Sequence, residues 1–169
     1  LPVPIATAQL AITEVMSSSS INFGTQLVTG GPDFWELTNF GTNDMNLTGY
    51  RFNDVEGGRL QAETNVFYNL VIRGGESILF FESKNAAISV DSFRAWWGLN
   101  ATQRVLAYPE GYGLSVDGDG LRLWGPAAVD EGDLIDSVDF GVATQGHSIT
   151  YDPMTGEFGV PTTMTTSTG

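Results

Sequence analysis

The sequence predicts an all-β sandwich, and three observations point to it. Short apolar runs recur along the chain and are separated by turn-forming residues, a spacing typical of sandwiches. The chain has 21 glycines and only 16% charged residues, a composition that favours tight turns over long amphipathic helices. Its 169 residues suffice to bury roughly two thirds of the unfolded surface in one β domain. We therefore expect one globular domain with short additions at its ends.

The first half of the chain contains five expected strands. Residues 9–16 form the first, with a bulge near Val15, where the alternation of apolar side chains breaks. The expected ranges of the other four strands are 34–38, 47–53, 67–72 and 78–81. In the strand at residues 34–38, Trp35 and Leu37 point to one face and the alternate residues point to the other.

One segment, residues 87–99, has helical rather than strand periodicity. Its aromatic side chains recur at helical spacing: Phe93, Trp96 and Trp97. Asp91 or Ser92 can cap the N-terminus of such a helix, and Gly98 can end it. We expect one short helix near residues 91–97, inserted in an otherwise β chain.

Four further strands complete the domain, and the chain ends differ from it in composition. The expected strands are residues 104–108, 121–124, 134–140 and 148–151. Residues 1–9 are an N-terminal extension whose apolar start ends in Ala6-Thr7-Ala8, which fits either the end of a signal peptide or a linker remnant. Residues 161–169 are rich in Thr and Ser, which indicates a linker to a further part of a larger polypeptide. The domain then spans residues 10–160.

Charge and composition exclude several classes of partner. Twenty acidic and 7 basic residues give a net charge of −13, which disfavours binding to nucleic acid and to anionic membranes. No apolar run approaches the roughly 20 residues of a membrane span. The chain has no cysteine, so disulfides, thiolate zinc sites and cysteine nucleophiles are excluded.

Several short segments follow one another along the chain in a fixed order: Ile12 to Met16, Asp33 to Asn39, Leu47 to Tyr50 with Asp54, Gly74 to Glu76, Gly113 to Ser115, Gly118 to Leu123, Ile135 to Val138 and Gly146 to Ser148. This series resembles the lamin tail domain family in its bacterial, secreted branch. The ordered series is specific, whereas no single segment is. Two features depart from the family pattern: no basic residue follows the last segment, and the helical insertion is longer.

The resemblance implies an immunoglobulin-like β-sandwich of about seven to nine strands with no catalytic machinery. It also implies an extracellular or cell-surface protein that binds or attaches, with a polysaccharide or a surface protein as ligand. Two alternatives stay open. The domain can be a structural spacer of a larger secreted protein, or, less in keeping with the motifs, a small glycan-active hydrolase.

Candidate catalytic residues are few. His147 is the one histidine, and Ser148 beside it would face the opposite side of a strand, so the two would not form a triad. Two carboxylates at a suitable separation would serve a glycosidase, but we expect structural uses for Glu14 and Glu36. Asp136 shares a strand face with core residues and therefore needs a partner; Arg122 is the candidate. We expect no catalytic residue.

Two kinds of residue remain as candidates for binding. Calcium prefers oxygen ligands from acidic, Gly-rich loops, and the candidate ligands flank the strand at residues 121–124: Asp117, Asp119, Asp130, Glu131 and Asp133. Solvated turns explain the same residues. A sugar needs exposed flat rings near polar side chains, and the candidate rings are Trp96, Trp97, Tyr108, Tyr112 and Trp124. Trp124 is expected to face outward because Leu121 and Leu123 occupy the opposite face of its strand.

Overall fold

The computed structural model describes residues 9–18, 32–55, 57–83, 88–152 and 154–161. Of the expected N-terminal extension (residues 1–9) and the expected tail (residues 161–169), residues 1–8 and 162–169 lie outside the described residues, and Pro161 belongs to the last strand. Within the described residues the protein is mostly β, with eleven strands and one α-helix. The all-β prediction is confirmed.

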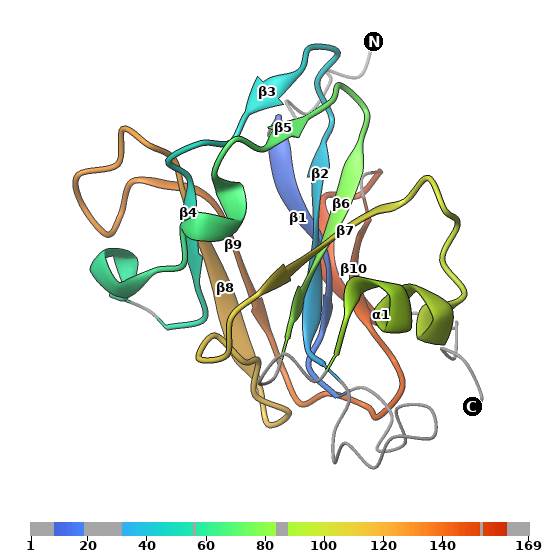
Figure 1. The fold of residues 1–169 in the computed structure, drawn as a ribbon. Coiled ribbons are helices and arrows are strands. Elements are labelled where there is room, and N and C mark those ends of the chain that lie inside the picture. The colour runs from blue at the N-terminus through green and yellow to red at the C-terminus, as the bar shows by residue number, and fades with distance from the viewer. Residues whose placement is uncertain (1–8, 19–31, 56, 84–87, 153, 162–169) are drawn as a thin grey trace, which may run out of the picture.

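The strands form one large sheet and two smaller ones (Figure 1). The large sheet has the order β11-β10-β1-β2-β6-β7. Its strands are β1 (Leu10–Met16), β2 (Phe34–Asn39), β6 (Ser77–Glu82), β7 (Arg104–Tyr108), β10 (Ile149–Asp152) and β11 (Glu157–Pro161). The second sheet has the order β4-β8-β9 and consists of β4 (Arg51–Asn53), β8 (Asp119–Trp124) and β9 (Leu134–Phe140). The third pairs β3 (Met45–Asn46) with β5 (Val71–Ile72).

The main core lies between the two larger sheets. Trp35 and Leu37 of β2 point into it as expected, and Phe52, Leu121 and Leu123 of the three-stranded sheet meet them there. All five side chains are fully buried. The ring of Trp35 stacks on Phe80 and lies 4.9 Å from the ring of Phe52. The inner faces of both sheets therefore contribute to one hydrophobic cluster.

The helix α1 (Val90–Trp97) lies in the connection between β6 and β7. These two strands run parallel, and parallel neighbours need a long crossover, which is commonly helical. Phe93 and Trp96 of α1 pack against Phe34 and Phe81 on the outer face of the large sheet. The strand β6 is thus covered on both faces, which explains its continuous apolar sequence.

The start of α1 differs from the expected one. Its N-cap is Ser89, neither Asp91 nor Ser92, because Ser89 and Ser92 form a reciprocal capping box in which the Oγ atom of each accepts the backbone N–H of the other. Gly98 ends the helix in the left-handed conformation, as expected.

Two expected strands are interrupted. Residues 47–53 do not form one strand, because Gly49 has a φ of +88° in a turn that separates β3 from β4. Residues 67–72 are strand only at β5, and a 3-10 helix, η2 (Asn65–Phe67), precedes it. A second 3-10 helix, η1 (Arg59–Gln61), follows β4. The bulge in β1 lies between Ile12 and Glu14, before the expected position.

Candidate functional site

The expected outward presentation of Trp124 is wrong. Its side chain is 1% exposed, and its Nε1 atom donates a hydrogen bond of 2.9 Å to the carbonyl oxygen of Glu131. The connection between β8 and β9 therefore folds back over the ring. A buried indole with its N–H satisfied is a structural side chain, so Trp124 offers no face to a sugar in this conformation.

The two tryptophans of α1 belong largely to the core. Trp96 is buried in the cluster between α1 and the large sheet. Trp97 is half-buried, and its ring centroid lies 5.1 Å from that of Phe34 in an edge-to-face arrangement. Both tryptophans therefore take part in the packing of α1 on the large sheet, with Trp97 the more exposed of the two.

The two candidate tyrosines differ from each other. Tyr108 ends β7 and is 1% exposed. Its hydroxyl donates a long hydrogen bond of 3.4 Å to the carbonyl oxygen of Tyr112. Tyr112 is half-buried and lies at the surface, where it lines a pocket. Trp124 also contributes to the lining of a pocket, beside Arg122 and Glu131, but its side chain is 1% exposed. Among the five candidate rings, Tyr112 combines a half-exposed side chain with a pocket that has polar neighbours.

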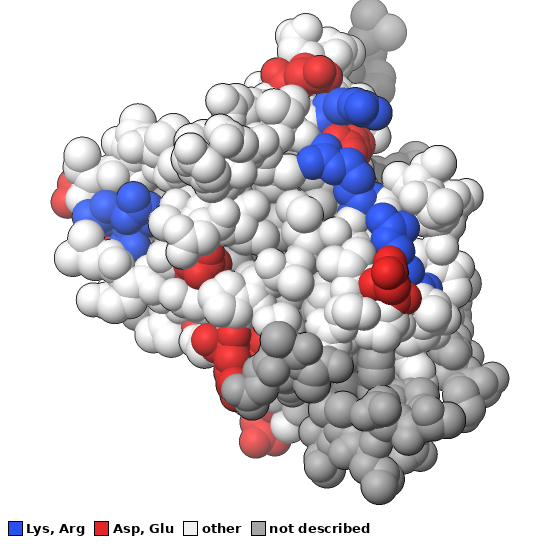
Figure 2. All heavy atoms as spheres, viewed as in Figure 1, with Lys and Arg blue, Asp and Glu red and all other residues white. Residues whose placement is uncertain are grey.

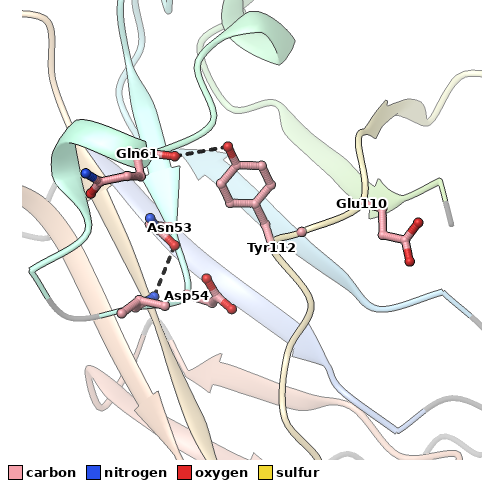
Figure 3. Close-up of a pocket in the computed structure, with 7 residues that line it drawn as sticks. Asn53, Asp54, Gln61, Glu110 and Tyr112 are labelled. Carbon is pink, nitrogen blue, oxygen red and sulfur yellow. Dashed lines mark hydrogen bonds between the residues drawn. The ribbon is translucent and has the colours of Figure 1, made fainter. Parts of the chain in front are cut away.

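The pocket at Tyr112 has a volume of about 380 Å³ and is open to solvent. Its lining comes from two distant parts of the chain: Asn53, Asp54, Val55, Gln61, Glu110, Gly111 and Tyr112. In Figure 3 the carboxylate of Asp54 lies below the tyrosine ring, and Glu110 lies to one side of it. We call it the Tyr112 pocket.

Two buried carboxylates hold the segment that carries Tyr112. Glu82 is 4% exposed, and its Oε1 atom accepts the N–H of Gly111 at 3.1 Å. Asp33 is 7% exposed, and its Oδ2 atom accepts the N–H of Leu114 at 2.9 Å. The segment is therefore fastened on both sides of the tyrosine.

Glycines allow this close approach of backbone and carboxylates. Gly111 has a φ of +118°, which a residue with a side chain rarely adopts. A Cβ atom at Gly113 would lie 3.3 Å from the Oδ2 atom of Asp33 and 3.4 Å from both carboxylate oxygens of Glu82. The backbone conformation at Gly111 and the close carboxylates at Gly113 thus explain why glycine stands on either side of Tyr112.

The opposite wall of the pocket is also held by hydrogen bonds. The amide of Asn53 donates to the carbonyl oxygen of Gly58 at 2.8 Å and accepts the N–H of Val55 at 3.2 Å. The hydroxyl of Tyr112 donates to the carbonyl oxygen of Gln61 at 3.0 Å, across the pocket (Figure 3). The two walls are thereby joined before any ligand is present.

The pocket has a negative electrostatic environment. Burial raises the pKa of Asp54, and the carboxylates of Asp119 and Glu82 raise it further. Burial also raises the pKa of Tyr112, and the carboxylates of Glu63 and Asp54 act in the same direction. Every charge that shifts these two pKa values is a carboxylate, so the site repels anions.

The five metal candidates lie at opposite ends of β8. Asp119, at the start of β8, pairs with the end of β9. Trp124, at the end of β8, pairs with the beginning of β9, and the other three candidates follow Trp124 in the chain. The candidates beyond Trp124 are Asp130, Glu131 and Asp133. Asp117 precedes Asp119 at the first end. The two groups therefore cannot share one ion.

Several of these acids close local turns. A carboxylate oxygen of Asp119 accepts the N–H of Ser115 at 2.9 Å. Both carboxylate oxygens of Glu131 accept the N–H of Arg59. The N–H groups of Val129 and Asp130 donate to Asp133 and lower its pKa. Among the described residues, no group of three or more His, Cys, Asp or Glu side chains is arranged to hold a metal ion.

The expected pair of Asp136 with Arg122 is wrong. Arg122 forms its salt bridge with Asp139 at 2.5 Å. Asp136 accepts the N–H of Ile12 at 2.7 Å and that of Ser137 at 2.9 Å, and burial raises its pKa. Its partner is the backbone at the bulge of β1, so a carboxylate of one sheet binds the main chain of the other.

Glu14 and Glu36 are register partners on β1 and β2. Burial raises the pKa of both carboxyl groups, and the Coulombic effect of Glu36 raises that of Glu14 further. Hydroxyl groups donate to them: Thr13 to Glu36 at 2.6 Å, and Ser148 to Glu14. Ser148 is 3% exposed, so its hydroxyl serves the sheet. The pair has the structural use that the sequence led us to expect.

Sequence reasoning missed most of the lining of the Tyr112 pocket. The two segments that line the pocket lie about fifty residues apart in the chain, so no pattern in the sequence groups them. The lining residues that were not candidates for this reason are Asn53, Asp54, Gln61 and Glu110. One local signal was present. Tyr112 stands between two glycines, a setting that presents a ring at the surface more readily than the middle of an apolar strand does.

No protein family model matches the chain, and a search of curated proteins found no match. None of the helices in the described part of the chain has the length and apolar character needed to cross a membrane.

Proposed function

We propose that this protein is a non-catalytic, extracellular binding module that holds a polysaccharide at the Tyr112 pocket. The observation that carries the proposal is the half-exposed ring of Tyr112 beside the carboxylates of Asp54 and Glu110. Sugar rings stack their apolar faces on aromatic side chains and use neighbouring polar groups for their hydroxyls.

We also propose that the fold is an immunoglobulin-like β-sandwich, and the arrangement of the strands supports this. Two sheets of mainly antiparallel strands contribute to one core, an arrangement compatible with an immunoglobulin-like β-sandwich of the lamin tail type. The parallel pair β6–β7 and the crossover helix are additions to that scheme. A binding role at loops beyond the strand ends suits such a scaffold.

The pocket is better suited to binding than to reaction. Asn53 and the hydroxyl of Tyr112 are engaged with the main chain, so their polar atoms build the walls. One side of the Tyr112 ring packs on Phe52, and its exposed part lines the pocket with Asp54 and Glu110, where a ligand can meet them. A rigid, preformed wall lowers the ordering cost of association.

Affinity electrophoresis tests the proposal with soluble β-glucan, xylan, mannan, pectin, glycol chitin and glycol chitosan. The wild-type chain is expected to be retarded by at least one of them. Tyr112→Ala should weaken the dissociation constant about tenfold, which corresponds to about 1.4 kcal/mol. Each gel is run with calcium and with a chelator, so that an effect of the acidic loops on binding is seen separately.

Tyr68→Ala is the matched control, because Tyr68 is 72% exposed and does not line the Tyr112 pocket. It should bind as the wild type does. Glu110→Gln is a second pocket variant at an exposed position, which removes a charge without removing packing. Retention by a surface protein and by no polysaccharide would contradict the proposal, as would release of new reducing ends from a bound polysaccharide.

A further inference from the structure

The charge of the Tyr112 pocket narrows the class of saccharide that fits it. Two of its seven lining residues, Asp54 and Glu110, are acidic, and none is Lys or Arg. Directly behind the wall, Glu82 binds the N–H of Gly111. A neutral sugar would leave this charge uncompensated.

The nearest arginines in the chain are used elsewhere. The guanidinium group of Arg59 donates to the carbonyl oxygens of Ala128 and Val129, at 3.2 and 2.6 Å. Arg51 donates to the carbonyl oxygen of Arg59. Arg59 thus binds the connection between β8 and β9, and Arg51 binds the main chain of η1. Figure 2 likewise shows the basic side chains of this face in two groups, apart from the acidic side chains at its lower edge.

An ammonium group fits this combination of groups. It donates charge-assisted hydrogen bonds to carboxylates, and it is attracted to the face of a tyrosine ring. The ring of Tyr112 and the side chains of Asp54 and Glu110 line the same pocket, with Asp54 below the ring and Glu110 to one side of it (Figure 3). An ammonium group bound in this pocket is therefore attracted both by the aromatic ring and by the negative charge of the lining.

We infer that the Tyr112 pocket binds a saccharide that carries a protonated amino group, such as a de-N-acetylated amino sugar. This inference rests on the proposed function and specifies its ligand. The pocket selects the ammonium form over the N-acetylated form, because acetylation removes the charge and adds bulk at the nitrogen.

The test compares two oligosaccharides that differ only in the acetyl group: β-1,4-linked hexamers of glucosamine and of N-acetylglucosamine. Binding to the full chain is measured by calorimetry at about pH 6, above the ordinary pKa of a carboxyl group. The glucosamine hexamer should bind about 10- to 100-fold more tightly, the range expected for hydrogen bonds to charged groups. Added salt should weaken it.

Matched variants separate the pocket from the overall charge of the protein, since any cation is attracted to a chain of net charge −13. Asp54→Asn and Glu110→Gln should each remove most of the preference for the glucosamine hexamer. Glu157→Gln makes the same change of charge at an exposed position on β11 and should leave the preference intact. An equal loss in Glu157→Gln and Glu110→Gln would overturn the inference.

The remaining outcomes distinguish this inference from the proposed function. If the N-acetylated hexamer binds as tightly, or if only a neutral polysaccharide binds, the ammonium inference is overturned and the binding module stands. If a lysine-rich peptide binds at the pocket and the glucosamine hexamer does not, the saccharide ligand is overturned. If nothing in the polysaccharide panel and neither hexamer binds, both are overturned.

Discussion

The two ends of β8 are built from the same kinds of residue and use them differently. At the end near Asp119, buried acids hold a glycine-flanked tyrosine at the rim of a pocket. At the other end, Trp124 is buried beneath a loop in which Asp133 binds the loop's own backbone and Glu131 binds the N–H of Arg59. The difference teaches that aromatic and acidic content does not locate a binding site. What distinguishes the two ends is the exposure of the ring: Tyr112 is half-buried at a pocket, whereas Trp124 is 1% exposed.

The largest expected effect concerns the ring of Trp124. Trp124→Ala should lower the free energy of unfolding by about 3–5 kcal/mol, because it removes a fully buried aromatic side chain and leaves a cavity. Urea denaturation measures this. Tyr68→Ala, at a site 72% exposed, should change stability by no more than about 0.5 kcal/mol. A stable Trp124→Ala that loses sugar binding would reverse our assignment of the two ends.

The second effect concerns the acid that holds the Tyr112 segment. Asp33→Ala should cost about 1–3 kcal/mol of unfolding free energy, since it leaves the buried N–H of Leu114 without its acceptor. Asp33→Asn keeps an acceptor and should cost less. Denaturation of both variants checks this. A gain in stability in Asp33→Ala would mean that repulsion from the neighbouring Glu82 outweighs the hydrogen bond.

The smallest effect is a contrast in pH dependence between the two ends. The pKa of Asp54 is raised and that of Asp133 is lowered from the ordinary value of 3.8. Asp54 therefore contributes stability that is present at low pH and lost as the pH rises through its folded pKa. Asp133 contributes stability that is present above 3.8 and lost as the pH falls through its folded pKa.

Asn variants should display the two signs. At neutral pH, Asp54→Asn should unfold at a higher temperature than the wild type, and the difference should disappear in acid. Asp133→Asn should unfold at a lower temperature at neutral pH, and that difference should also disappear in acid. Thermal unfolding from about pH 7 down to about pH 3 measures both. Shifts of the same sign would remove the electrostatic contrast between the two ends.

The strands whose limits could be predicted best are those in which apolar residues mark the buried positions along the strand itself. The limits of β7 and β9 agree with the expected residues 104–108 and 134–140. By contrast, β11 was missed, because its pairing with β10 is not signalled by local apolar alternation. Local periodicity reports burial on one face and says little about which strand supplies the other partner.

The candidate site could be predicted only in part, and the reason is geometric. Tyr112 was a candidate from its type, but Asp54 and Gln61 reach it through the pairing of β4 with β8, which a sequence does not display. Trp124 was misjudged because the group that buries it, the carbonyl of Glu131, belongs to a loop. Loop conformation depends on tertiary contacts more than on composition.

The bond between Asp136 and the N–H of Ile12 has a mechanical consequence. It joins β9 of the smaller sheet to β1, which is itself paired on both edges by β2 and β10. Sliding of one sheet over the other would break this hydrogen bond as well as the packing of the shared core. A pulling force applied through the first strand is thus transmitted to the smaller sheet at Asp136 in addition to the core.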